Sequence, residues 1–129
     1  MFREQMEIYG VSLQKIANDT LESKYEKGVK LTKKMAEEID NVQLSLAKGE
    51  DQFIIADFSN GGVQLDKEAE MYFLRDGKMI PYTNALAIIS NPSKFGFLKR
   101  FFSKKQSFYP IKEVHSREEA QMWFDTLKQ

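Results

Sequence analysis

The sequence predicts a single α/β domain built on a mixed sheet of about five strands, with helices mostly on one face. Two short and nearly all-apolar runs carry this prediction, residues 53–58 (FIIADF) and 85–89 (ALAII). Runs of this kind are typical of strands that are buried on both faces of a parallel sheet. A turn and a helical pattern follow each run, and strands that alternate with helices indicate an α/β fold. The length of 129 residues suits one domain, so we expect a single domain over residues 1–129.

The N-terminal segment predicts two antiparallel strands. Residues 6–16 alternate imperfectly between apolar and polar side chains, and Gly10 interrupts the alternation in the manner of a bulge. Asn18 and Asp19 are turn residues, and we expect the second strand over residues 20–26.

A helix is predicted from a cap at Thr32 to about Lys48. Four apolar residues fall on one stripe of this helix, at Met35, Ile39, Val42 and Leu46. Gly49 follows where a left-handed residue commonly ends a helix.

The central part of the chain continues the alternation. We expect a strand over residues 52–58, a tight turn at residues 59–62 and a helix over residues 66–75. A further strand over residues 84–89 leads to Pro92, which suits the first position of a helix over residues 92–103.

The C-terminal part predicts a last strand and a last helix. The strand covers residues 107–114, and Pro110 within it argues for an edge position because proline cannot donate a ladder hydrogen bond. Ser116 begins a capping box that ends at Glu119. The expected order is therefore ββαβαβαβα, and right-handed crossovers would place the helices between parallel strands on one face.

Four segments between residues 5 and 128 together resemble a known family: FIIADFSN, ALAIIS, FGFLKRFF and SFYPIKEVHSREEAQMWF. The chain resembles the STAS-like family, typified by bacterial anti-sigma factor antagonists, and looks closer still to a branch of small uncharacterised bacterial proteins. The resemblance implies a non-catalytic regulatory module that docks onto partner proteins. The antagonists carry Asp-Ser-Ser-Gly, with one phosphorylated serine, where this chain has residues 66–69 (DKEA). Lys67 stands at the matching position, so the phosphoserine switch is not carried over.

Polar residues gather where two predicted strands end. Asp57 ends one strand, Ser59 and Asn60 follow it, and Ser90 and Asn91 follow the next strand. Ligands of open α/β sheets bind at this edge, so these five residues are a candidate crevice, and an enzyme would need Asp57 and the loop at Ser90 and Asn91 to form its site. Alternatively, Asp57 accepts hydrogen bonds from its own turn, as Asp commonly does, and we favour this second interpretation.

Residues 77–112 contain seven Lys or Arg residues and no Asp or Glu. Within this stretch the candidate interaction surface consists of Lys94, Phe97, Lys99, Arg100, Phe101, Lys104 and Lys105. On a helix, Phe97 and Phe101 would lie beside the stripe expected to pack on the sheet. If exposed, they would suit an acidic partner helix, an anionic membrane or single-stranded nucleic acid. The alternative is a core helix with a solvated basic edge, which the packing habit of aromatic residues favours.

Composition excludes several kinds of chemistry. The chain has no cysteine and one histidine, His115, and lacks dinucleotide and P-loop motifs. We therefore expect no catalytic residues, no metal and no cofactor. The expected partner is another protein; the alternative is an anionic membrane or an apolar ligand held through residues 92–105. Nucleic acid is not expected, and a homodimer stays open. With no signal peptide or membrane span in the sequence, we expect a cytoplasmic protein.

Overall fold

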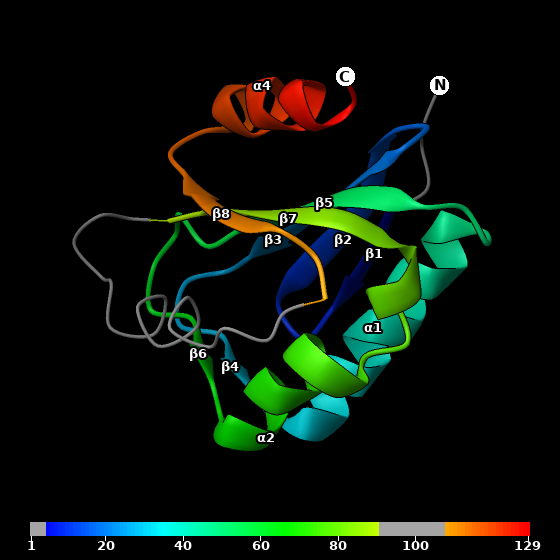
Figure 1. Ribbon diagram of the computed structural model, residues 1–129. Coiled ribbons are helices and arrows are strands. Elements are labelled where there is room, and N and C mark those ends of the chain that lie inside the picture. The colour runs from blue at the N-terminus through cyan, green and yellow to red at the C-terminus, as the bar shows by residue number, and fades with distance from the viewer. Residues whose placement is uncertain (1–4, 91–107) are drawn as a thin grey trace.

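The computed structural model describes residues 5–90 and 108–129 (Figure 1). Its main sheet has six strands in the order β1-β2-β3-β5-β7-β8. These strands are β1 (Gln5–Ile8), β2 (Val11–Ala17), β3 (Thr20–Tyr25), β5 (Gln52–Asp57), β7 (Thr83–Ile89) and β8 (Ile111–Val114). The first three pair in antiparallel fashion and the last four, from β3 to β8, pair in parallel. The predicted mixed α/β sheet is confirmed, with six strands where about five were expected.

The extra strand comes from the predicted strand over residues 6–16, which is a hairpin. Tyr9 and Gly10 have φ angles of 55° and 78°, and two successive positive φ angles make the tight turn that joins antiparallel strands. Gly10 is therefore a turn residue and not the predicted bulge. A Cβ atom at this position would lie 2.9 Å from the side chain of Val29, so only glycine fits.

Helix α1 (Lys33–Ala47) begins and ends as predicted. The Thr32 hydroxyl accepts a hydrogen bond from the backbone N–H of Met35 at 3.3 Å, which satisfies one of the free amides of the first turn. Lys48 and Gly49 end the helix with φ angles of 52° and 79°. A short parallel pair that was not predicted, β4 (Lys30–Leu31) and β6 (Gln64–Leu65), lies outside the main sheet.

The helix predicted over residues 66–75 is divided. Asp66 caps α2 (Lys67–Met71) by accepting from the backbone N–H of Ala69 at 2.8 Å. The chain then widens into a π-helical turn, η1 (Tyr72–Asp76), and a short 3-10 helix, η2 (Ile80–Tyr82), leads into β7.

The buried carboxylate of Asp40 holds these turns against α1. It accepts hydrogen bonds from the Tyr72 hydroxyl at 2.8 Å and from the backbone N–H groups of Lys78 at 2.7 Å and Met79 at 3.2 Å. Three bonds to one buried carboxylate account for the irregular path of this segment.

Helix α4 (Arg117–Leu127) lies on one face of the sheet, and α1 and α2 lie on the other (Figure 1). Ser116 caps α4 by accepting from the backbone N–H of Glu119 at 3.1 Å, as the capping box predicts. The α1 face holds the larger apolar cluster and the α4 face a smaller one. Strand β8 is an edge strand, as Pro110 predicts, but it begins only after Pro110, and residues 108–110 of the predicted strand are not part of it. The predicted helix over residues 92–103 lies outside the described residues.

Candidate functional site

The turn after β5 uses the polar side chains of the candidate crevice. One carboxylate oxygen of Asp57 accepts from the backbone N–H of Ser59 at 2.9 Å. The amide of Asn60 donates to the carbonyl oxygen of Tyr25 at 3.0 Å, which ties this turn to the end of β3. Asp57 thus makes the turn-capping contact that we weighed against a catalytic role.

Ser90 lies at the end of the neighbouring strand, where its buried hydroxyl donates to the carboxylate of Glu113. Asp57 pairs with Ile89 in the sheet, so the two strand ends are adjacent. Their side chains diverge, however. Asp57 continues the side of β5 that packs against α4, whereas Glu113 neighbours Val114 of that cluster and points to the opposite face. Asn91 lies outside the described residues, and the crevice as a ligand site stays a prediction.

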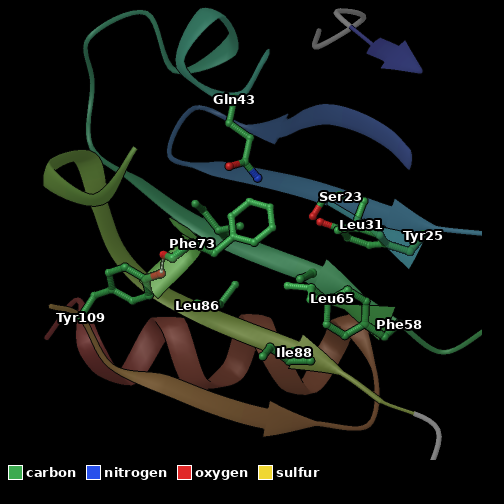
Figure 2. Close-up of a pocket in the computed structure, with 12 residues that line it drawn as sticks. Ser23, Tyr25, Leu31, Gln43, Phe58, Leu65, Phe73, Leu86, Ile88 and Tyr109 are labelled. Atoms are coloured by element: carbon green, nitrogen blue, oxygen red, sulfur yellow. Dashed lines mark hydrogen bonds between the residues drawn. The ribbon is translucent and has the colours of Figure 1, made fainter. Parts of the chain in front are cut away.

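A hollow of about 60 Å³ lies on the α1 face of the sheet (Figure 2). Ten of the described lining residues are apolar or aromatic and two are polar. They are Tyr25, Leu31, Ile54, Ala56, Phe58, Leu65, Phe73, Leu86, Ile88 and Tyr109, with Ser23 and Gln43. They come from the main sheet, from the short pair β4 and β6, from α1, from the turns after β5 and α2, and from the segment before β8. No motif in the sequence marks this hollow.

Aromatic side chains form much of the wall. The rings of Tyr25 and Phe58 meet edge to face with centroids 4.7 Å apart. The hydroxyl of Tyr109 donates to the carbonyl oxygen of Phe73 at 3.3 Å. Burial raises the pKa of Tyr25 and of Tyr109 to about 12, so both phenols keep their protons at neutral pH.

One polar lining residue stands on the apolar stripe of α1. Gln43 follows Ile39 by four positions, is only 8% exposed, and extends from the helix toward the sheet (Figure 2). The other, Ser23, donates weakly to the carbonyl oxygen of Ile55 at 3.4 Å. Two polar residues, Asp40 and Gln43, lie among the buried residues of α1, and polar residues on the inward face of a helix were the signal in the sequence that could have indicated a site here.

The α4 face carries an ion pair that no pattern in the sequence predicts. Glu22 of β3 is buried, and Arg117 at the start of α4 binds it through two nitrogens, at 2.7 and 2.5 Å. The amide of Gln14 donates to the same carboxylate at 3.2 Å. The hydrogen bond to Glu22 raises the pKa of Arg117 further above its usual value. This paired carboxylate fastens α4 to the sheet.

Most of the remaining predicted residues lie outside the part of the chain that the structure describes. The whole candidate interaction surface lies outside the described residues: Lys94, Phe97, Lys99, Arg100, Phe101, Lys104 and Lys105. His115 is exposed. Within residues 5–90 and 108–129, no group of three or more His, Cys, Asp or Glu side chains could hold a metal ion. Of the helices in that same part of the chain, none is long and apolar enough to cross a membrane.

Comparison with known proteins identifies the fold and the family. No curated protein matches this sequence. The structure is similar to the crystal structure of an uncharacterised protein of the DUF3478 family, which has a SpoIIAA-like fold and comes from Shewanella loihica PV-4. The TM-score is 0.61 at 18% identity, over 94% of this chain and 98% of that chain. This likeness confirms the predicted STAS-like fold. A family model described as a domain of unknown function, DUF7793, matches residues 14–128, and the chain therefore belongs to the DUF7793 family.

Proposed function

We propose that this protein is a non-catalytic regulatory module of the cytoplasm that acts by docking onto an acidic partner protein. One observation carries the non-catalytic part. Three polar side chains of the candidate crevice are engaged within the fold, Asp57 with its own turn, Asn60 with β3 and Ser90 with β8. A catalytic base or nucleophile needs a polar atom directed at a substrate, and these side chains serve the loops instead.

The choice of partner rests on charge. Residues 77–112 have seven basic side chains and no acidic one, although Lys, Arg, Asp and Glu balance over the whole chain. A stretch of one sign attracts a surface of the opposite sign and sets the rate and selectivity of docking. Lys78 and Lys112, the two described basic residues of this stretch, are both exposed.

Carbodiimide cross-linking in an extract of the source organism tests the docking. This reagent joins lysine amines to carboxylates in direct contact. We expect a discrete adduct that weakens as salt rises and disappears in the double variant Lys99→Glu/Arg100→Glu. The matched control is Lys33→Glu/Lys34→Glu, which reverses two exposed charges on α1 and should leave the adduct intact. An adduct that both double variants lose equally, or that neither loses, would contradict the proposal.

Membrane binding is the competing outcome for the same residues. Co-sedimentation with phosphatidylglycerol and phosphatidylcholine vesicles separates it from protein docking. Binding that needs the anionic lipid and is lost in Phe97→Ala/Phe101→Ala would replace the proposed partner with a membrane. Phe108→Ala, which removes a ring that is 70% exposed, is the control.

A further inference from the structure

We propose that the hollow on the α1 face binds a small uncharged molecule that has an apolar body and one hydroxyl or carbonyl group. This inference goes beyond the proposed function, because no charged side chain is among the described residues that line the hollow. It depends on three features of the site: an apolar wall, an unpaired amide and a fitting volume.

The wall favours an apolar body. Tyr25, Phe58, Phe73 and Tyr109 supply aromatic surface, and aliphatic side chains from β5 and β7 supply the floor (Figure 2). Rings meet such walls by edge or offset stacking, as Tyr25 and Phe58 already do with each other. The hydroxyl of Tyr109 is held by the carbonyl oxygen of Phe73, so its ring presents an ordered surface.

The amide of Gln43 supplies the polar contact. It is more than nine-tenths buried, yet no partner accepts from it or donates to it among residues 5–90 and 108–129, and Figure 2 draws no hydrogen bond from it to another lining residue. Within the described residues, the fully buried side-chain atom that lacks a partner is Oε1 of Gln52, so the amide atoms of Gln43 are not sealed in the core and keep access to the hollow that the residue lines. Asp40, one turn earlier on α1, shows the contrast with its three hydrogen bonds. The fold therefore satisfies Asp40 and leaves Gln43 for a ligand.

The volume limits the ligand. At about 60 Å³, the hollow exceeds the roughly 15 Å³ that a water molecule needs and is smaller than the roughly 150 Å³ of an apolar cavity that encloses benzene. It therefore takes part of a ring or the end of a chain, with the remainder of the molecule outside.

Two probes of nearly equal shape test the site, 4-fluorophenol and 4-fluorotoluene, observed by ¹⁹F NMR during titration of the whole protein. We expect the phenol to bind about fivefold tighter, the ratio that one neutral hydrogen bond supplies. In Gln43→Leu the ratio of the two affinities should fall to about one, and 4-fluorotoluene should still bind. Gln121→Leu, a half-buried glutamine on α4, should keep the wild-type ratio.

The position of binding is measured independently from the backbone amides of the wild-type protein. In ¹H–¹⁵N spectra, the phenol should shift the amides of Ser23, Gln43 and Ala56 and leave those of Ala120 and Phe124 on the α4 face unchanged. The absence of binding by both probes, shifts confined to the α4 face, or an unchanged ratio in a folded Gln43→Leu protein would each overturn the proposal.

Discussion

The two faces of the sheet differ in how completely their cores are filled and their polar groups are paired. On the α4 face, Phe124 is completely buried against Phe53, with ring centroids 4.8 Å apart, and the one buried carboxylate there, Glu22, is paired with Arg117. The α1 face has the larger cluster, yet it contains a hollow of about 60 Å³ and the unpaired amide of Gln43. The smaller core is therefore the more completely filled and satisfied one.

This difference separates stability from binding. Full burial and paired charges are what a helix needs to stay attached to a sheet. A void and an unpaired polar group lower the stability of a core. Proteins keep such features at sites where a function requires them. We infer that the α4 face mainly holds the domain together and that the α1 face carries binding.

The largest expected effect is on the filled face. Phe124→Ala should lower the free energy of unfolding by about 3–5 kcal/mol, because the ring is buried and its loss leaves a cavity. The matched change Phe73→Ala, at a half-buried ring beside the existing hollow, should cost about half as much. Urea denaturation measures both. Equal losses would show that the two faces do not differ in packing.

The ion pair of the α4 face comes next. Arg117→Ala leaves the carboxylate of Glu22 buried without its cation and should cost about 3 kcal/mol. The double variant Arg117→Ala/Glu22→Gln should regain part of this loss, since the glutamine is neutral and can still bond to Gln14. If Arg117→Ala lowers the free energy of unfolding by less than about 1 kcal/mol, the pair contributes no more than an ordinary surface ion pair.

Alkaline pH should weaken the α1 face selectively. Tyr25, Tyr72 and Tyr109 pack on that face, and burial, aided for Tyr72 by its hydrogen bond to Asp40, raises the pKa of each to about 12. An unfolded tyrosine titrates near about 10, so the unfolded state loses its protons first and stability falls as pH rises from about 10 to 12. Each such tyrosine contributes at most about 1.4 kcal/mol per pH unit to that slope.

Tyr25→Phe checks this pH dependence. The free energy of unfolding, measured between pH 9 and pH 12, should fall less steeply in the variant than in the wild type. Hydrogen exchange at high pH should reach the amides of α1 before those of α4. Parallel slopes for variant and wild type, or simultaneous exchange in both helices, would remove pH as a means of distinguishing the faces.

Local signals predicted much of the fold. The caps at Thr32 and Ser116 act within three residues, and the apolar runs of β5 and β7 are continuous in the sequence. The prediction of one strand through residues 9–10 was wrong. The hairpin turn there needs a positive φ angle at Tyr9, and residues other than glycine rarely adopt one.

The two faces could not be told apart from the sequence. Glu22 and Arg117 lie 95 positions apart, so only the folded sheet brings them together. The sequence places Gln43 on the inward face of α1, but only the folded sheet shows that its amide lines a hollow and has no partner among the described residues. Contacts of this range depend on the path of the whole chain, which periodicity within one element does not encode.

The smallest expected effect is also the sharpest test of the comparison. Gln43→Leu replaces a largely buried side chain, whose amide has no partner within the described residues and lines the hollow, by an apolar one, so it should raise the free energy of unfolding by about 0.5–1 kcal/mol. Few core substitutions stabilise a protein. An increase in the free energy of unfolding is expected here only if the amide of Gln43 is unpaired in the ligand-free protein. Urea denaturation with and without 4-fluorophenol measures it: the probe should stabilise the wild type more than the variant, because ligand binding to the folded state adds to stability. A loss of stability in Gln43→Leu would mean that the amide is already satisfied within the fold, and the α1 face would then be a second structural core.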